Sequence, residues 1–212
     1  MGERFAVARR PLQNRVTPFG EIEALTGRGT MLGNRGTLCD DAQHIVRKWQ
    51  VRRWIACRLH VPGRRRKLMQ PHTWTELFFL DEAAAFAAGH RPCAACLYAD
   101  YKRFKELWIG CFGGPAGADD MDDRLHADRI LKGGMKRTHR AEISELPEGT
   151  YIALEGEAWV VIGERLLAWS DNGYTTSQSR FRHREVDVLT PASLVTVMAA
   201  GYVPRLHPSA AQ

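Results

Sequence analysis

Residues 81–96, DEAAAFAAGHRPCAAC, constrain the fold of this chain most. Asp81 is placed to cap a short alanine-rich helix, because an aspartate before a helix accepts hydrogen bonds from its first free backbone N–H groups. Gly89 supplies the left-handed residue that commonly ends a helix. Cys93 and Cys96 follow as a Cys-x-x-Cys pair at the start of a second predicted helix. Two thiolates at this spacing can face one ion, which gives half of a tetrahedral zinc site.

The remaining zinc ligands are expected from an earlier part of the chain. Residues 54–60 have the pattern of a strand, in which Cys57 and His60 point to opposite faces. If the strand that carries Cys39 pairs near this one, the thiols of Cys39 and Cys57 can both meet the Cys-x-x-Cys pair. The preferred ligand set is therefore Cys39, Cys57, Cys93 and Cys96, and the alternative replaces Cys39 with His60. Four protein ligands leave no open coordination position, so this zinc would be mainly structural.

Residues 78–96, FFLDEAAAFAAGHRPCAAC, carry a family resemblance. They resemble the second half of the Ada-type metal-binding domain, the zinc module of Ada DNA-methylation repair proteins, in which Ala-Gly-Phe-Arg-Pro-Cys-Lys-Arg-Cys follows an alanine-rich helix. The close match covers roughly a tenth of the chain, and a loose one extends over residues 33–110. Where the family has Cys-x-x-x-Cys, this chain has the separated Cys39 and Cys57. The resemblance implies a zinc-bound thiolate that accepts a methyl group from a DNA phosphotriester, and Cys57, or in its place Cys39, would fill that role.

A second signal is the absence of acidic residues between Asp41 and Glu76. The interval combines basic residues with Trp49, Trp54 and Trp74. Guanidinium groups bind phosphates, and indole rings can stack on bases, so the interval predicts contact with nucleic acid. The Ada resemblance favours DNA over RNA, and a solvated β-ribbon with core tryptophans is the competing interpretation. The predicted contact residues are Arg47, Lys48, Arg52, Arg53, Arg64, Arg65, Arg66 and Lys67.

The predicted fold class is α+β. A small zinc-stabilised β-ribbon with helices is followed by a small β-barrel or a curled antiparallel sheet with a C-terminal helix. Strands are expected at 151–154, 158–162, 166–169 and 186–189 from their apolar and β-branched residues. The predicted organisation is an N-terminal arm (1–32), the zinc module (33–110), a Gly-rich linker and helix (111–139), and a small β domain with its helix (140–212).

Composition limits the function classes. The 212 residues carry a net charge of +6, which is compatible with an anionic partner. No apolar run is long enough for a membrane span, and the first residues lack a signal-peptide pattern, so we expect a cytoplasmic protein without a membrane partner. Five cysteines in that compartment favour metal binding or reactive thiols over disulfides.

These observations support a leading hypothesis and two alternatives. The leading hypothesis is a zinc-binding protein with structural zinc and a nucleic-acid-contacting role. The first alternative is a zinc-thiolate methyl acceptor in DNA repair, with Cys57 as the acceptor. The second is an enzyme of unknown reaction with a pocket between the two domains. No recognisable catalytic triad or carboxylate pair supports a particular reaction.

Overall fold

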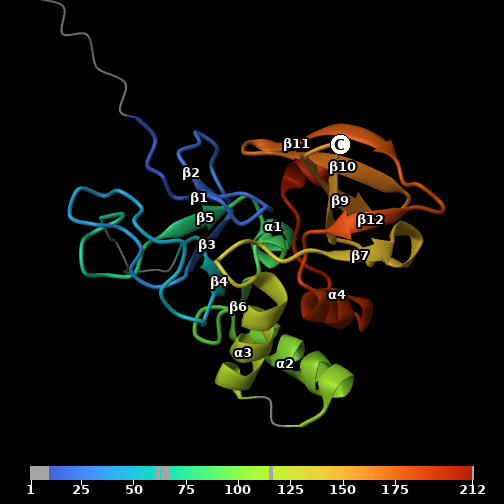
Figure 1. The fold of residues 1–212 in the computed structure, drawn as a ribbon, viewed down its shortest axis with the longest axis horizontal. Coiled ribbons are helices and arrows are strands. Elements are labelled where there is room, and N and C mark those ends of the chain that lie inside the picture. The colour runs from blue at the N-terminus through green and yellow to red at the C-terminus, as the bar shows by residue number, and fades with distance from the viewer. Residues whose placement is uncertain (1–9, 61–62, 64–66, 115–116, 212) are drawn as a thin grey trace, which may run out of the picture.

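The computed structural model describes residues 10–60, 63, 67–114 and 117–211. Within them the protein is a mixed α+β fold with two six-stranded sheets and four α-helices (Figure 1). The first sheet contains β1 (Arg15–Val16), β2 (Ile22–Glu23), β3 (Met31–Asn34), β4 (Ile55–Arg58), β5 (Leu77–Phe79) and β6 (Arg91–Pro92). The second contains β7 (His139–Glu142), β8 (Tyr151–Leu154), β9 (Glu157–Ile162), β10 (Arg165–Ser170), β11 (Gly173–Ser179) and β12 (Glu185–Val188). The helices are α1 (Glu82–Ala87), α2 (Tyr98–Phe112), α3 (Ala118–Arg129) and α4 (Ala192–Ala199), with 3₁₀ turns at Ile143–Glu145 and Pro208–Ala211.

The first sheet has the strand order β2-β1-β5-β3-β4-β6. Leu32 in β3 lies directly opposite both Cys57 in β4 and Phe78 in β5. Directly opposed residues point to the same face of a sheet, so these three side chains share one face. The other face carries Ala56 and Leu77, which are fully buried in the core. The sheet therefore has one face in the core and one face that presents Cys57.

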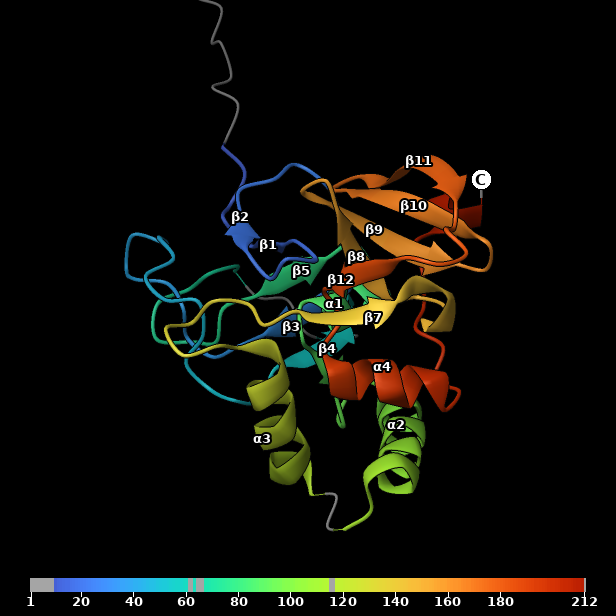
Figure 2. The same ribbon diagram turned by 45° about the vertical axis from the view of Figure 1, so that its right-hand side comes forward.

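Helix α1 lies between the two sheets and is buried along its whole length (Figures 1 and 2). The Asp81 carboxylate accepts a hydrogen bond from the backbone N–H of Ala84 at 2.8 Å, as the predicted cap requires. Gly89 follows the helix with a φ of 89°. The second carboxylate oxygen of Asp81 accepts from the hydroxyl of Tyr174 at 2.6 Å and from the backbone N–H of His207 at 2.9 Å. One buried carboxylate thus joins α1 to the second sheet and the C-terminal segment.

The second sheet has the order β11-β10-β9-β8-β12-β7, and every pairing in it is antiparallel. Over the described residues β11 and β7 stay at opposite edges, so the sheet does not close and the predicted barrel is wrong. An antiparallel sheet followed by a C-terminal helix is confirmed. The sequence did not predict β7 or β11. Strand β11 is rich in Thr, Ser and Gln, and it begins where Asp171 and Asn172 suggested only a turn.

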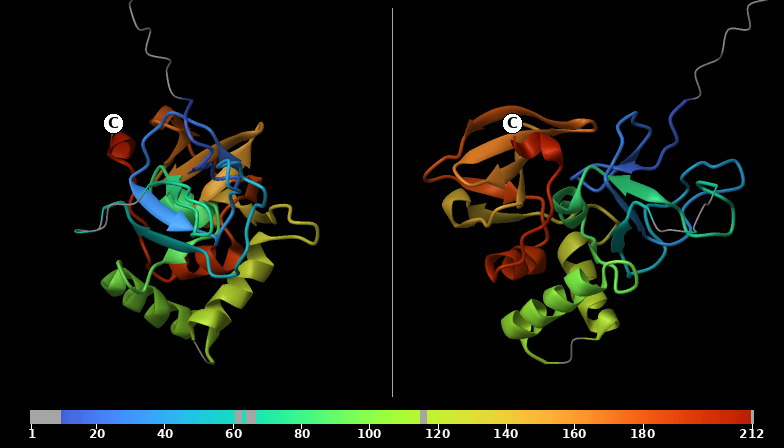
Figure 3. Two further views of the ribbon diagram at one scale, coloured as in Figure 1. Left: turned by 90° about the vertical axis from the view of Figure 1, so that its left-hand side faces the viewer. Right: turned by 180° about the vertical axis from the view of Figure 1, so that it is seen from behind.

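The two sheets share one hydrophobic core. Leu77 and Phe79 of the first sheet belong to the same buried cluster as Tyr151 and Val160 of the second. A further cluster lies between α2, α3 and α4, which pack together on one side of the molecule (Figure 3). The predicted domain boundaries remain a prediction, but the core is continuous across them.

Two segments differ from the sequence-based expectation. Residues 10–32, predicted as part of an arm, supply β1 and β2, and β1 pairs in parallel with β5. Residues 44–51 have the β-branched and aromatic residues, spaced by polar ones, that favour a strand, but Ile45 forms only an isolated bridge, with Cys39. The side chain of Asp40 accepts the backbone N–H groups of Ala42 and His44 at 3.0 and 2.9 Å. This local turn competes with strand pairing, since aspartate readily satisfies backbone groups two to four residues ahead.

None of the described helices has both the length and the apolar character needed to cross a membrane. A membrane span needs about 20 mainly apolar residues. Helix α2 has 15 residues and carries Lys102, Arg103, Lys105 and Glu106.

Candidate metal centre

Cys57 and Cys93 are brought together by the parallel pairing of β4 with β6. Ala56 in β4 lies opposite Pro92 in β6. The next backbone N–H along the chain, that of Cys93, donates to the carbonyl of Ala56 at 2.9 Å. Strand β6 is at the edge of the sheet, where a proline without an N–H group is tolerated. The chain therefore leaves β6 with Cys93 beside the strand that carries Cys57.

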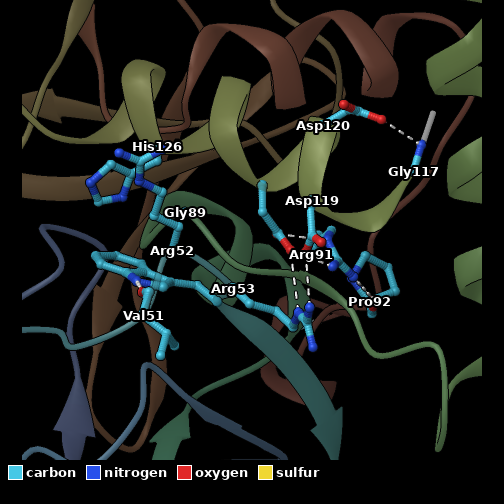
Figure 4. A network of polar contacts seen from close by, with 12 residues as sticks. Val51, Arg52, Arg53, Gly89, Arg91, Pro92, Gly117, Asp119, Asp120 and His126 are labelled. Carbon is cyan, nitrogen blue, oxygen red and sulfur yellow. Dashed lines mark hydrogen bonds and ion pairs between the residues drawn. The ribbon is translucent and has the colours of Figure 1, made fainter. Parts of the chain in front are cut away.

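Strand β6 is held in place by a buried ion pair. Arg91 donates to both carboxylate oxygens of Asp122 in α3, at 2.8 and 2.6 Å, and both side chains are almost fully buried. Figure 4 shows Arg91 and Pro92 next to α3, with Arg53 and Asp119 nearby. Removing one partner of such a pair typically destabilises a protein strongly, because the other charge stays buried. The pair thus fixes the strand that leads into the Cys-x-x-Cys turn.

The Cys-x-x-Cys turn brings the third sulfur to the same place. The backbone N–H of Leu97 donates to the carbonyl of Cys93 at 3.0 Å, so the turn leads directly into α2. The backbone N–H of Arg58 donates to the sulfur of Cys96 at 3.4 Å. The sulfurs of Cys57, Cys93 and Cys96 all lie within 4.8 Å of one another. Sulfurs around a tetrahedral zinc with 2.3 Å bonds are about 3.8 Å apart, so these three are close enough to bind one metal ion.

The three thiols share negative charge unequally. A hydrogen bond from the Cys57 thiol lowers the pKa of Cys93 to about 5; burial opposes this shift, and the backbone N–H groups of Cys96 and Ala95 reinforce it. The same bond to Cys93, together with burial, raises the pKa of Cys57 far above its usual value. Burial also raises the pKa of Cys96. The group therefore holds one thiolate and two thiols, and a bound cation would displace the remaining protons.

The three sulfurs lie on the wall of a pocket of about 600 Å³. The pocket occupies the face of the first sheet on which Leu32, Cys57 and Phe78 lie side by side. Its lining is mostly apolar and comprises Leu32, Asn34, Ile55, Cys57, Arg58, Leu59, Leu68, Trp74, Glu76, Phe78, Cys93, Ala95 and Cys96. An ion held among these sulfurs would be reachable from the pocket.

Cys39, one of the four predicted ligands, lies outside this group. Its buried thiol donates to the carbonyl of Met69 at 3.6 Å and accepts from the hydroxyl of Thr75 at the same distance. The reason is that β4 pairs with β3 and β6, whereas Cys39 forms only an isolated bridge with Ile45 and does not lie beside β4. His60, the alternative ligand, is exposed and also lies outside the group. Within the described residues, three of the four preferred ligands come together without a fourth.

The predicted nucleic-acid residues are only partly described. Arg64, Arg65 and Arg66 lie outside the described residues, whereas Arg47, Lys48, Arg52, Arg53 and Lys67 are exposed. Three of the exposed residues form ion pairs, Lys48 with Glu21 at 2.8 Å, Arg52 with Asp123 at 2.9 Å and Arg53 with Asp119 at 2.8 Å. Exposed pairs of this kind contribute about 0–1 kcal/mol, so a phosphate can replace the carboxylate. Contact with nucleic acid stays a prediction.

Comparisons with protein-family models, with curated proteins and with solved structures were then made for the whole chain. None of them gave a match. The resemblance of residues 78–96 to the Ada family therefore stays a prediction that rests on the motif. Evidence about function comes from the arrangement of the side chains.

The pocket beside the cysteines has no signal in the local sequence. Phe78 and Glu76 line it from β5 and the residues just before it, and Trp74 lines it from the preceding loop. Side chains alternate between the two faces along a strand, so Glu76 and Phe78 are expected on one face. Only the register of β3 against both β4 and β5 shows that Cys57 lies on that face too.

Proposed function

We propose that the protein binds zinc through Cys57, Cys93 and Cys96. The fourth coordination position would be open to the adjoining pocket, from which a water or a substrate would bind. The observation that carries the proposal is the closeness of three sulfurs on the pocket wall. Thiolates select zinc, copper(I) and iron–sulfur clusters over hard cations, and zinc is the common choice for a tetrahedral thiolate site. Zinc sites with three protein ligands keep one position for a water or a substrate. This proposal replaces the closed, mainly structural site expected from four protein ligands.

The open position is tested with cobalt-substituted protein. The purified protein is expected to contain about one zinc per chain, as for a single tetrahedral site. After exchange for Co²⁺, adding imidazole or a small thiol should change the visible absorption spectrum, because the added ligand enters the fourth position. The Cys39→Ala variant should respond in the same way. A cobalt absorption spectrum that does not change with any added ligand would indicate a closed site and would overturn the proposal.

For the partner, we propose nucleic acid, with DNA favoured over RNA. The supporting observation is the setting of Arg58, which is exposed, lines the pocket and bonds to Cys96 through its backbone. Trp74 and Phe78 line the same pocket and offer aromatic surface. Phosphate contact by arginine and stacking on aromatic rings are the usual combination for single-stranded nucleic acid.

Nucleic-acid binding is expected to weaken as salt rises, with log K falling by about 0.7–0.9 per phosphate contact for each unit of log salt. Fluorescence anisotropy with single-stranded DNA, duplex DNA and RNA at several salt concentrations measures this slope. The Arg58→Ala variant should bind more weakly and lower the slope by roughly one contact. The matched control is Lys102→Ala, an exposed cation on α2. Equal binding by both variants would argue against contact at the pocket.

A zinc-thiolate methyl acceptor is the second candidate, favoured by the half-buried Cys57 sulfur on the pocket wall. In that reaction the thiolate attacks the methyl carbon, the carbon–oxygen bond breaks and a phosphodiester anion leaves. A peptide containing Cys57 that gains the mass of one methyl group, after incubation with methylphosphotriester DNA, would support it. The alternative of an enzyme with a pocket between the two domains draws no support from this pocket, which lies on the first sheet.

A further inference from the structure

A second cluster of charged side chains surrounds Trp54, away from the cysteines. The guanidinium carbons of Arg35 and Arg129 lie 4.0 and 4.1 Å from the centre of the Trp54 ring. All three side chains are at least 98% buried. The ammonium of Lys136 reaches the same region and donates to the carbonyl of Ala87 at 2.5 Å. Two buried cations and a third on the partly buried Lys136 are thus gathered at one place, where an unpaired charge is costly.

The protein supplies too little negative charge for this cluster. Among the described residues, Glu21 and Asp122 are the carboxylates that stabilise the charged forms of these three side chains. Glu21 already pairs with Lys48 at 2.8 Å, and Asp122 already pairs with Arg91 at 2.6 Å. The cluster therefore keeps an excess of positive charge.

Two of the buried guanidinium nitrogens have no hydrogen-bond acceptor among the residues that the structure describes. Arg35 donates a hydrogen bond from Nη1 to the carbonyl of Gly20 at 3.0 Å, whereas its buried Nη2 is unpartnered. Arg129 donates from Nη1 to the carbonyl of Gly89 at 2.7 Å and from Nη2 to that of Arg52, whereas its buried Nε is unpartnered. Figure 4 labels Gly89 and Arg52, the two residues whose carbonyls accept these bonds. Buried N–H donors of charged groups are normally satisfied, so these two point to a missing acceptor.

A small cavity lies at the centre of the cluster. It has a volume of about 20 Å³, and its lining includes Glu21, Arg35, Lys48, Trp54, Arg129 and Lys136. A cavity needs roughly 10–15 Å³ to hold a sphere the size of a water molecule. This one therefore admits a single atom of that order of size, such as a chloride ion.

We propose that this cavity is a binding site for a halide ion, held by Arg35, Arg129 and Lys136. The anion supplies the acceptor that the two guanidinium nitrogens lack and compensates the excess positive charge. Burial lowers the pKa of both arginines to about 9 and that of Lys136 to about 7. The charge of Arg35 adds to the lowering at Arg129, and the charges of both arginines add to it at Lys136. A halide among them would raise all three pKa values and so favour the charged forms.

The test is thermal unfolding in sodium chloride and in sodium gluconate at equal ionic strength, because gluconate is too large for the cavity. Binding to the native state should raise the Tm by about 3–5 °C for each tenfold rise in chloride above the dissociation constant, and gluconate should not. Crystals soaked in sodium bromide should show an anomalous peak between Arg35 and Arg129.

Two variants at the cavity make the test specific. Lys136→Met should reduce the chloride dependence, whereas Glu21→Gln removes the competing carboxylate and should increase it. Lys102→Met changes an exposed cation of α2 that does not line the cavity, so it is the control and should keep the wild-type dependence. Equal Tm values in chloride and gluconate, without a bromide peak, would show that a water molecule fills the cavity and would overturn the proposal. An unchanged chloride dependence of the Tm in Lys136→Met would also overturn the proposal.

Discussion

Replacing Cys93 with alanine is expected to lower zinc affinity by more than about 100-fold, since loss of an outer partner of a metal ligand alone typically costs 10–100-fold. Cys93 is the sulfur to which the Cys57 thiol donates, and it lies next to Cys96 within the 4.8 Å group. Cys57→Ala and Cys96→Ala should have effects of similar size. Elemental analysis of the purified variants and competition with a coloured chelator measure the loss.

The remaining two cysteines provide matched controls for this experiment. The thiol of Cys39 bonds to the carbonyl of Met69, and that of Cys111 to the carbonyl of Thr196 at 3.8 Å. Cys39→Ala and Cys111→Ala should therefore keep the full zinc content. If Cys39→Ala loses the metal and Cys93→Ala retains it, the three-sulfur site is not the metal site. Loss of metal in all five variants would instead indicate that binding depends on overall stability.

The second large effect is expected for Asp81→Ala, which should lower the free energy of unfolding by about 3–5 kcal/mol. Loss of a helix cap costs about 0.5–2 kcal/mol, and each buried donor left without an acceptor costs about 1–3 kcal/mol. The substitution leaves the N–H of Ala84, the hydroxyl of Tyr174 and the N–H of His207 without this acceptor. Urea unfolding followed by circular dichroism gives the value.

Asp41→Ala is the control for Asp81→Ala, because the Asp41 side chain is 84% exposed and its loss should change stability by no more than about 0.5 kcal/mol. A double-mutant cycle with Tyr174→Phe isolates the bond between Asp81 and Tyr174, which should show a coupling energy of about 0.5–3 kcal/mol. A zero coupling energy would mean that the carboxylate acts only as the cap of α1.

Local chemistry made part of the fold predictable. The cap at Asp81, the stop at Gly89 and strand β8 all follow from residues that are close in the sequence. The Cys-x-x-Cys pair was predictable for the same reason. The helix after Thr190 also forms, since α4 covers Ala192–Ala199.

The third sulfur depended on long-range pairing, which the sequence does not encode in any local pattern. Cys39 and Cys57 look equally suitable as ligands, yet β6 pairs beside β4 and places only Cys57 near Cys93. The turn made by Asp40 replaces the strand that would have carried Cys39 there. No local pattern marks Arg35 as a core residue either, although it is 99% buried.

The shared core also bears on how the chain folds while it is being synthesised. Asp81 and its partner Tyr174 are 93 residues apart, so at 5–20 residues per second their synthesis is separated by roughly 5–20 s. Until β8 has been synthesised, the apolar surface of α1 that packs against Tyr151 has no second sheet to cover it. The second sheet thus completes the first during synthesis rather than folding beside it.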